Sequence, residues 1–536
     1  MHEEPLSSVD AAWLHMEHPA NLMMVTGVLT FDEPLDFASL TRVIGDGLKP
    51  YPRFRQRVVE PRLPLGSPRW ELDPAFDLHS HVHRVALPSP GDQQALQELV
   101  SDLMSTPLDF SKPLWQFHLI EGYGSGCAVL ARLHHAIADG IALIQVLLSL
   151  TDQAPPVPEA PPVPPEPTGW ERLGSMTETL LKPTVDALKR SFVEPSESSR
   201  PGDASGALPG LPVSARALLA PAAAVVSRAV QATETLWHEG VSWLSHPENA
   251  LELVERAAGG ANALGKLLLM SPDPMTAFKG PLGVAKRAAW SGPIPLADVK
   301  RVGRALSATI NDVLLACATG ALRRYLAGGE PLHDLEVRAV VPVNLRSPTD
   351  TVRLGNRFGL VFLPLPVGLE DPLDRLYELK QRMDDIKRSP EAVVAFGLLG
   401  AIGMAPTEIE HLVLNLFGTR GTAVMTNVPG PREPISLAGK RVSGLMFWVP
   451  QSGRLGLGLS ILSYAGNVSI GVATDAGLVP DPEKLVADFA LEFDELLTIV
   501  KSEEEATPVP AAAVVNAAPP SPPKRRKPTR KRKASR

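Results

Sequence analysis

A proline-rich segment, QAPPVPEAPPVPPEP at residues 153–167, constrains the fold of this chain more than any other feature. Proline fixes φ and lacks a backbone N–H donor, so this stretch favours an extended spacer over a helix or a central strand. The chain has 536 residues, whereas a single hydrophobic core stops growing near about 250–300 residues. At least two domains are therefore expected, with the proline-rich segment at the first boundary.

The regions on both sides of this segment predict a mixed α/β structure. Before it, residues 22–31 and 126–135 are short, apolar strand candidates, and residues 36–48 and 140–150 have helical spacing. After it, a helix is expected at residues 307–329, with Thr or Asn near its cap and Gly after its end. Strand candidates separated by Gly, Pro and Asn follow at 336–346, 359–368, 421–431, 455–466 and 467–477.

These patterns predict two α/β halves joined by a helical linker. The expected units are an N-terminal domain at 1–152, the proline-rich segment and linker at 153–285, a C-terminal domain at 286–502 and a disordered tail at 503–536. One linker helix has an apolar face that would pack in the core or lie on a lipid interface; its residues are Val226, Val230, Trp237, Val241, Leu244 and the neighbouring Trp243.

Composition places the chain among globular enzymes of a reducing compartment. Hydrophobic residues make up 44% and charged residues 21%. Cys127 and Cys317 are the only cysteines, which excludes a disulfide framework and a cysteine-based zinc cluster. The N-terminus lacks the pattern of a secretory signal, and no stretch of about 18 residues is apolar throughout. We expect a cytoplasmic protein, and any membrane association should be peripheral.

The last residues form a basic, low-complexity tail. Residues 524–536 contain nine Lys and Arg and no acidic residue, although the whole chain has a net charge of −7. Such a cluster could attract anionic lipid headgroups, bind nucleic acid without sequence preference, or remain solvated without a partner. The cluster holds no aromatic residue, which disfavours base stacking.

The stretch RLHHAIADGIALI at residues 132–144 holds the main candidates for catalysis. His134 and His135 fall at the end of a predicted strand, and Asp139 and Gly140 open the predicted helix. Neutral imidazole is the best general base near pH 7. Asp139 would hold an imidazole tautomer or pair with an arginine, and Gly140 would let a substrate or another backbone approach.

Other interpretations of this motif remain. A metal site is one, although further ligands and an H-E-x-x-H motif are missing nearby. A buried, hydrogen-bonded structural role is another, especially for His134. A serine nucleophile is disfavoured, because the chain has no G-x-S-x-G motif. A base that acts directly on an acceptor hydroxyl needs no covalent enzyme intermediate.

Residues 134–140, HHAIADG, resemble the H-H-x-x-x-D-G motif of acyltransferases of the chloramphenicol acetyltransferase and condensation-domain type. The chain further resembles the bacterial wax ester synthase/diacylglycerol acyltransferase family over roughly residues 5–500. That resemblance rests on motifs in a fixed order: PLSSVDAAWL at 5–14, PLW at 113–115, NDVLLA at 311–316, PVNLR at 342–346, LGNRFG at 354–359 and NVPGP at 427–431.

The resemblance implies two chloramphenicol-acetyltransferase-like domains with a tunnel between them. Long-chain acyl-CoA would enter from one side as a co-substrate, and a diacylglycerol or fatty alcohol from the other, with no further cofactor. His135 would remove the proton of the acceptor hydroxyl and then protonate the CoA thiolate. The products would be triacylglycerol or wax ester, made at the inner membrane or at lipid inclusions.

The resemblance also implies roles for residues outside the histidine motif. Asn311 would assist the oxyanion site, with a helix N-cap as the alternative, and Asp312 would contact substrate or be structural. Asp139 would brace the loop through an ion pair, and Gly140 would keep the tunnel open.

The remaining candidates lie in the other motifs. Pro113, Leu114 and Trp115 would line the tunnel or pack in the core. Arg346, Asn356 and Arg357 would contact CoA phosphates or hold the two halves together.

Two other functions compete with neutral-lipid synthesis. One is acyl transfer to a different acceptor, such as an amine or a polyketide hydroxyl. The other is a lipid-binding or inclusion-coating protein that keeps the fold without turnover.

Overall fold

A computed structural model describes residues 4–61, 68–152, 270–328, 332–346, 354–389, 391–392, 394–396, 418–451, 453 and 455–506. The proline-rich segment, the linker helix with its tryptophans and the basic cluster at 524–536 lie outside the described residues. The two α/β halves of the prediction lie within them.

The first half is built on a five-stranded sheet in the order β15-β2-β7-β6-β5. The pairs β15–β2, β2–β7 and β7–β6 are antiparallel, and β5–β6 is parallel. The strands are β2 (Met24–Phe31), β5 (Val82–Ala86), β6 (Trp115–Tyr123), β7 (Gly126–His134) and β15 (Gly444–Trp448). A small sheet, β1-β4-β3, lies beside it, formed by β1 (Glu4–Pro5), β3 (Gln56–Val59) and β4 (Arg69–Leu72).

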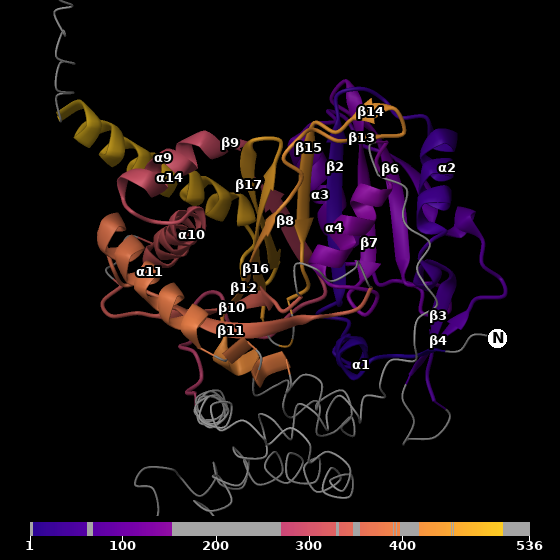
Figure 1. Cartoon of the computed structure of the whole chain (residues 1–536), viewed down its shortest axis with the longest axis horizontal. Helices are drawn as coiled ribbons and strands as arrows, with labels where there is room; N and C mark the ends of the chain where they lie inside the picture. The colour runs from indigo at the N-terminus through magenta and orange to yellow at the C-terminus, as the bar shows by residue number, and fades with distance from the viewer. Residues whose placement is uncertain are drawn as a thin grey trace, which may run out of the picture.

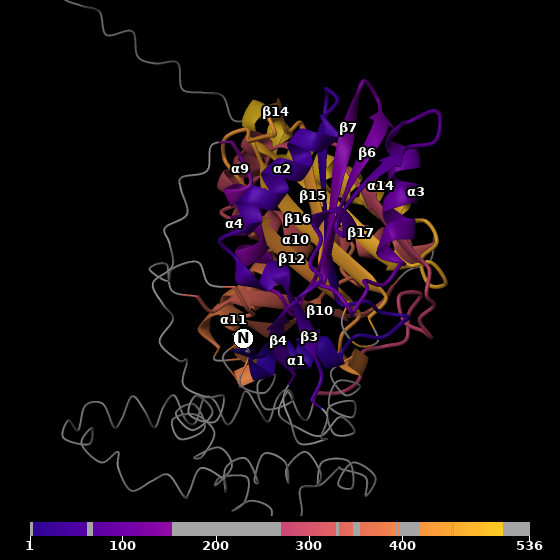
Figure 2. The same ribbon diagram turned by 90° about the vertical axis from the view of Figure 1, so that its right-hand side faces the viewer.

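Helices cover both faces of this sheet (Figures 1 and 2). One face packs against α2 (Phe37–Leu48) and α4 (Gly140–Ser149), and the other packs against α3 (Gln93–Met104). Because both faces are buried, β7 is buried along its whole length. The N-terminal helix α1 (Ser8–His15) lies near the β7–α4 connection, and two short 3-10 helices span Pro52–Arg55 and Leu78–Ser80.

The second half is built on a seven-stranded sheet with the path β11-β10-β12-β16-β17-β8, in which β9 also pairs with β17. The β10–β12 and β12–β16 pairs are parallel, and the other pairs are antiparallel. The strands are β8 (Lys286–Trp290), β9 (Ile294–Pro295), β10 (Val337–Asn344), β11 (Phe358–Leu365), β12 (Ala423–Pro429), β16 (Leu457–Tyr464) and β17 (Asn467–Asp475).

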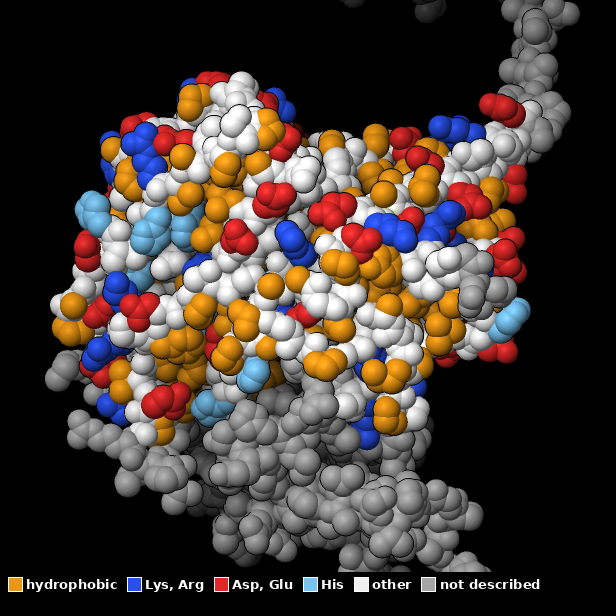
Figure 3. All heavy atoms as spheres, turned by 180° about the vertical axis from the view of Figure 1, so that it is seen from behind, with side chains coloured by type: hydrophobic (Ala, Val, Ile, Leu, Met, Phe, Trp, Pro, Cys, Tyr) orange, Lys and Arg blue, Asp and Glu red, His pale blue; other side chains and the backbone are white. Residues whose placement is uncertain are grey.

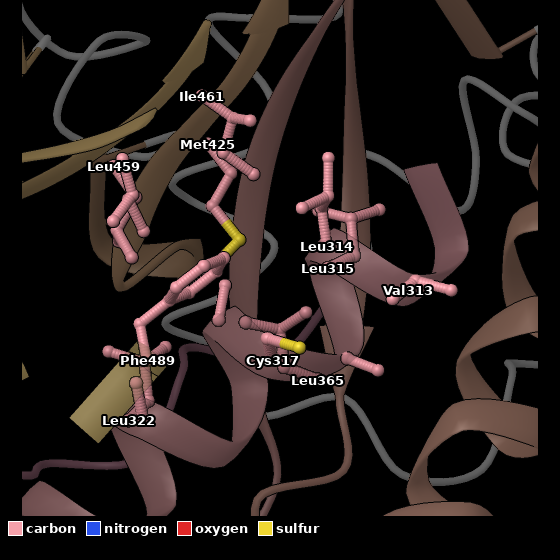
Figure 4. Close-up of a cluster of buried hydrophobic side chains, with 14 of the residues drawn as sticks. Val313, Leu314, Leu315, Cys317, Leu322, Leu365, Met425, Leu459, Ile461 and Phe489 are labelled. Carbon is pink, nitrogen blue, oxygen red and sulfur yellow. The ribbon is translucent and has the colours of Figure 1, made fainter. Parts of the chain in front are cut away.

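Helices of the second half pack their apolar faces on this sheet. They are α9 (Leu296–Ala305), α10 (Ile310–Ala327), α11 (Pro372–Arg388) and α14 (Pro482–Ala506). Figure 4 shows the centre of this core, where Phe489 of α14 lies beside Met425 of β12 and Leu322 of α10. Side chains this deeply buried are typically worth about 1.5–3 kcal/mol each relative to exposure.

The two halves are not independent along the chain, because β15 from the second half completes the first sheet. β15 pairs with β2 in register from Gly444 opposite Thr30 to Trp448 opposite Thr26. A short hairpin of β13 (Ser436–Leu437) and β14 (Lys440–Arg441) precedes it. Residues within the range 286–502, predicted as the second domain, therefore contribute to the sheet that carries the histidine motif.

The secondary-structure predictions in the described residues are confirmed, with differences in detail at two helix ends. Gly328 ends α10 with a positive φ of 49°, as the glycine after the helix end predicted. Asp36 caps α2, which had not been predicted. Thr309, not Asn311, is the N-cap of α10. The helix α14 runs to Ala506, so its last residues overlap the tail predicted at 503–536.

Among the described residues, no single helix has both the length and the apolar composition needed to cross a membrane. Helices α9 and α10 meet that requirement only as a pair, and they are bent by 97° where they meet. On the face seen in Figure 3, acidic and basic side chains alternate with scattered hydrophobic ones.

Candidate active site

The motif HHAIADG forms the turn between β7 and α4. The backbone of β7 holds both histidines: the His134 N–H donates to the Leu114 carbonyl at 2.9 Å, and the His135 N–H donates to the Met23 carbonyl at 2.7 Å. Both side chains are buried, with 0% of His134 and 4% of His135 exposed. A strand therefore fixes the position of two imidazoles before the chain turns.

The His135 ring lies in an aromatic and apolar setting. It stacks on Trp13 of α1 with a centroid distance of 4.4 Å and an interplanar angle of 24°, and Phe358 of β11 lies 5.6 Å away. The Nδ1 atom of His135 is enclosed and has no hydrogen-bond partner among the described residues.

This setting changes the acid–base behaviour of His135. Burial, which disfavours the charged ring, lowers the pKa of His135 to about 4, and neighbouring His134 acts in the same direction. Asp139 and the Asn356 side chain oppose the shift. His135 is therefore neutral at pH 7, which is the state that a general base needs.

Protein groups surround the His134 ring, but only Nδ1 has a hydrogen-bond partner among the described residues. Its Nδ1 accepts the Ala136 N–H at 3.1 Å, which places the ring proton on Nε2. Nε2 lies 3.5 Å from a carboxylate oxygen of Glu17, and Phe110 contacts the ring edge at 5.6 Å. These contacts match the structural alternative that the sequence left open for His134.

Asp139 uses both carboxylate oxygens to fix the turn. Oδ1 accepts the Ala142 N–H at 2.9 Å and caps α4. Oδ2 accepts from Arg346 at 2.7 Å and from the Arg357 N–H at 3.0 Å. No described hydrogen bond joins Asp139 to either imidazole, so the geometry is that of an ion pair and a helix cap.

The segment at 354–357, from the second half, lies directly against the turn. The Gly355 N–H donates to the Ile137 carbonyl at 3.1 Å, and Arg346 donates to the Gly355 carbonyl at 2.7 Å. Gly355 has a φ of 108°, which favours glycine, and a side chain there would point toward the Asp10 carboxylate. The LGNRFG motif thus places a backbone edge against the turn, and its Asn356 and Phe358 side chains lie beside His135.

Asn356 connects three parts of the site. Its Nδ2 donates to the His135 carbonyl at 2.8 Å and to Asp10 Oδ1 at 2.8 Å, and its backbone N–H donates to the same oxygen at 3.1 Å. Arg53 completes the group by donating to Asp10 Oδ2 at 3.2 Å and to the Ile137 carbonyl at 3.3 Å. Asn356 therefore holds the backbone of His135 in place.

The PLW motif supports the histidines from behind. Pro113, Leu114 and Trp115 are all buried. Trp115 donates its Nε1–H to the Phe54 carbonyl at 2.9 Å and stacks on His81 at 4.4 Å. The motif therefore packs in the core behind the histidines, and Leu114 supplies the carbonyl that fixes the His134 backbone.

Asn311 and Asp312 begin α10 in the second half. Asp312 forms a capping box with Thr309, because its carboxylate accepts the Thr309 N–H at 2.9 Å and Thr309 caps in return. Asn311 accepts from Asn427 at 3.1 Å, which joins the N-D motif to the NVPGP motif. Among the described residues, no hydrogen bond or ring contact connects Asn311 with the histidine motif.

Sequence reasoning missed several residues around the histidine turn: Trp13 and Glu17 lie against the imidazoles, whereas Asp10 and Arg53 bind Asn356 and the Ile137 carbonyl. Asp10 and Trp13 lie in the quoted stretch at 5–14, and Glu17 and Arg53 lie in no motif that was singled out. The sequence offered one signal for Asp10 and Trp13: an acidic residue and a tryptophan on the same apolar helix, α1. Within the part of the chain that the structure describes, no group of three or more His, Cys, Asp or Glu side chains could hold a metal ion.

The two sheets joined by β15 and the clamped H-H-x-x-x-D-G turn define a class of two-domain, condensation-type acyltransferases. The chain belongs to the wax ester synthase/diacylglycerol acyltransferase family: the model of that family's catalytic domain matches residues 6–314, and the model of its C-terminal domain matches residues 354–497. It is an acyltransferase of neutral-lipid synthesis.

Relatives and solved structures agree with this assignment. Two proteins named as diacylglycerol O-acyltransferases, from Mycobacterium bovis and Mycobacterium tuberculosis, share 31% sequence identity with this chain. The alignment covers 92% of this chain and 96% of each relative. The wax ester synthase/diacylglycerol acyltransferase of Marinobacter aquaeolei VT8 has the same fold, with a TM-score of 0.60 and 21% identity over 93% of this chain and all of that one. The first condensation domain of the calcium-dependent antibiotic synthetase matches with a TM-score of 0.53 and 15% identity, over 93% and 98% of the two chains.

Proposed function

We propose that the enzyme transfers a long-chain acyl group from acyl-CoA to the hydroxyl of a diacylglycerol or a fatty alcohol, with His135 as the general base. The observation that carries this proposal is the setting of His135: a buried imidazole that stacks on Trp13, whose carbonyl accepts from Asn356, and whose pKa is lowered by burial so that the ring is neutral at pH 7. Acyl-CoA is the co-substrate, and the reaction as proposed needs no metal or other cofactor.

The proposed step moves one proton and exchanges one bond. Nε2 of His135 takes the hydroxyl proton as the acceptor oxygen attacks the thioester carbonyl, which forms a tetrahedral oxyanion. The carbon–sulfur bond then breaks, and the imidazolium returns its proton to the CoA thiolate. The ester and free CoA leave, and His135 is neutral again.

Other residues have positioning and supporting roles in this proposal. Asp139, Arg346 and Asn356 hold the turn so that the imidazole keeps one orientation. Asn311 remains our candidate to assist the oxyanion site, where one donor typically contributes a few kcal/mol to the barrier. Gly140 leaves open space, because a side chain added there would meet no protein atom within 4 Å.

The test is product formation from palmitoyl-CoA offered with hexadecanol and with dioleoylglycerol in parallel, using wild type and His135→Ala. We expect wax ester or triacylglycerol from wild type, and a loss of both in the variant with unchanged circular dichroism. A folded wild type that makes neither product would overturn the acceptor assignment, and a lipid-binding protein without turnover would become the better description. Full activity in His135→Ala would overturn the role of the base.

The proposed acceptors are insoluble in water, so we also propose that the enzyme works at a membrane or lipid-inclusion surface. The basic cluster at 524–536 supports this proposal, since Lys and Arg near an anionic surface contribute about 1 kcal/mol each. The test is co-flotation with phosphatidylglycerol vesicles for the full chain and for a chain ending at residue 506. Equal binding of both chains would contradict a role for the tail.

A further inference from the structure

Three side chains near the start of the chain lie against the histidine turn. Asp10, Trp13 and Glu17 are spaced three and four residues apart, as neighbours on one helix face are. The Asp10 carboxylate accepts from Asn356 at 2.8 Å. The Trp13 ring stacks on His135. Glu17 follows the C-terminal end of α1, and its carboxylate reaches the backbone that holds the general base.

The Glu17 carboxylate is bound to the backbone of Met23. Its Oε2 accepts the Met23 N–H, and the carbonyl of Met23 accepts the His135 N–H at 2.7 Å. Met23 is fully buried and directly precedes β2, the strand that pairs with β7. One residue therefore connects the carboxylate with the peptide group of the base.

The backbone of His135 is held at both of its polar groups. Met23 accepts its N–H at 2.7 Å, and Asn356 donates to its carbonyl at 2.8 Å. Each of these two partners is bound in turn by a carboxylate from the start of the chain. Asp10 acts on one side of the base through Asn356. Glu17 acts on the other side through Met23.

Glu17 also faces the other imidazole of the turn. The same Oε2 lies 3.5 Å from His134 Nε2, which has no hydrogen-bond partner among the described residues. That separation is longer than a normal N–H···O hydrogen bond, whereas the contact with the Met23 N–H is a hydrogen bond. The geometry therefore favours an effect of Glu17 through Met23 over an effect through His134.

We propose that Glu17 is a positioning residue for acyl transfer, which fixes the His135 imidazole against the acceptor hydroxyl through the Met23 peptide. This role rests on the proposed function, because Glu17 acts only through the base. Only 17% of the Glu17 side chain is exposed, so loss of its carboxylate leaves the Met23 N–H without a ready partner. A displacement of about 1 Å at a reacting group can lower a rate about a hundredfold.

Three substitutions separate the hydrogen bond of Glu17 from its charge. Glu17→Ala removes both, Glu17→Gln keeps an oxygen that can accept the Met23 N–H, and Glu17→Asp keeps the charge but withdraws the carboxylate by one methylene. We expect Glu17→Ala to lower kcat about tenfold to hundredfold, with KM for both substrates within about twofold of wild type. Glu17→Gln should stay within about threefold of wild type, and Glu17→Asp should be slower than Glu17→Gln.

The matched control is Asp92→Ala, which also removes a carboxylate from a backbone donor. Asp92 accepts the Ala95 N–H at 2.9 Å and caps α3, and no described hydrogen bond connects it with the histidine turn. This variant should lose some stability and keep wild-type kinetics. Circular dichroism checks the folding of every variant.

Combination with the two histidine variants identifies the group through which Glu17 acts. Residues that act through one group have non-additive effects, whereas independent effects multiply. Radiolabelled palmitoyl-CoA with hexadecanol measures the residual activity of the slow variants. We expect Glu17→Ala to cost less than about threefold in the His135→Gln background and to keep its full effect in the His134→Gln background.

Several results would overturn this role for Glu17. An equal loss in the His135→Gln background would show a general effect on the fold, and a loss that disappears in the His134→Gln background would show an effect through the other imidazole. A faster Glu17→Asp than Glu17→Gln would show that the charge matters instead of the hydrogen bond. Wild-type kcat in Glu17→Ala, with His135→Gln inactive, would remove the role of Glu17 and leave the proposed function standing. Full activity of His135→Gln would overturn both.

Discussion

Arg346 and Asp139 form a buried ion pair that joins the two halves of the molecule at the histidine turn. The guanidinium Nη2 lies 2.7 Å from Asp139 Oδ2, with only 9% and 7% of the two side chains exposed. The same carboxylate caps α4 and accepts the Arg357 N–H. One contact therefore fixes both the position of the turn and the approach of the second sheet.

Removal of one partner of this pair should destabilise the protein strongly. Arg346→Ala leaves the Asp139 carboxylate buried without its cation, and breaking a buried pair in this way typically costs about 3–5 kcal/mol. We expect a matching decrease in the free energy of unfolding, measured by urea denaturation. The control is Lys49→Ala, whose exposed pair with Asp46 should contribute nothing measurable. Equal stability of the two variants would contradict a bracing role for Arg346.

Asn356 should matter for catalysis because it holds the backbone of the base. In Asn356→Ala, the His135 carbonyl and Asp10 lose their shared donor, and an unsatisfied buried group costs about 1–3 kcal/mol. We expect a tenfold to hundredfold decrease in kcat/KM, on the order of the effect of small misplacements in active sites. Asn467→Ala, which removes a side-chain bond in the β16–β17 turn, is the control and should keep wild-type kinetics. Unchanged kinetics in Asn356→Ala would exclude the positioning role.

Trp13 should control the pKa of the base. Its ring covers the His135 imidazole at 4.4 Å, and burial is the main reason why the pKa of His135 is lowered to about 4. In wild type, kcat/KM should therefore stay constant from pH 8 down to about pH 5 and fall below it. Trp13→Ala admits water, so the acidic limb of the pH profile should move toward pH 6.5. Trp13→Phe should restore most of the wild-type profile, and identical profiles for all three proteins would contradict this account of the pKa.

Buried histidines should make the fold sensitive to mild acid. Burial lowers the pKa of His135 to about 4 and the pKa of His118 to about 3, whereas both groups titrate near 6.5 when unfolded. Below pH 6.5 the unfolded chain takes up protons that the folded chain does not. Stability is therefore fully present above pH 6.5 and decreases as the pH falls toward 4, by about 3 kcal/mol for His135 alone. Urea denaturation at pH 7.5 and 4.5 measures this loss, and His118→Gln should make it smaller. Equal stability of wild type at both pH values would contradict the prediction.

The sequence was informative about strands and helices for a physical reason. The apolar runs that became β2 and β7 are buried on both faces, and the pattern around residues 307–329 carries a cap at each end, so local residue types decide these elements. The addition of β15 to the first sheet depends on pairing with residues about 400 positions earlier in the chain, as in Met446 opposite Val28. No local pattern encodes such a pairing.

The part of the site that lies in one sequence motif could be predicted, and the part that depends on tertiary contacts could not. His134, His135 and Asp139 are adjacent in sequence, so a motif reveals them. Asp10 and Trp13 reach the site only because α1 folds against the turn, and their residue types are common in ordinary helices. From the sequence, Asp139 could either hold an imidazole tautomer or pair with an arginine. Only the folded position of Arg346, after β10, shows that Asp139 forms the ion pair.

The most direct test of the central claim compares the two adjacent histidines. Steady-state kcat/KM with palmitoyl-CoA and the preferred acceptor should be measured for wild type, His135→Gln and His134→Gln, each checked for folding by circular dichroism. A general base typically contributes 10²–10⁴-fold, so we expect His135→Gln to lose about 10³-fold or more. The loss in His134→Gln should be much smaller and should follow its stability, because His134 Nδ1 accepts the Ala136 N–H and its Nε2 faces Glu17 at 3.5 Å. A folded His135→Gln within about tenfold of wild type would contradict the assignment of His135 as the base.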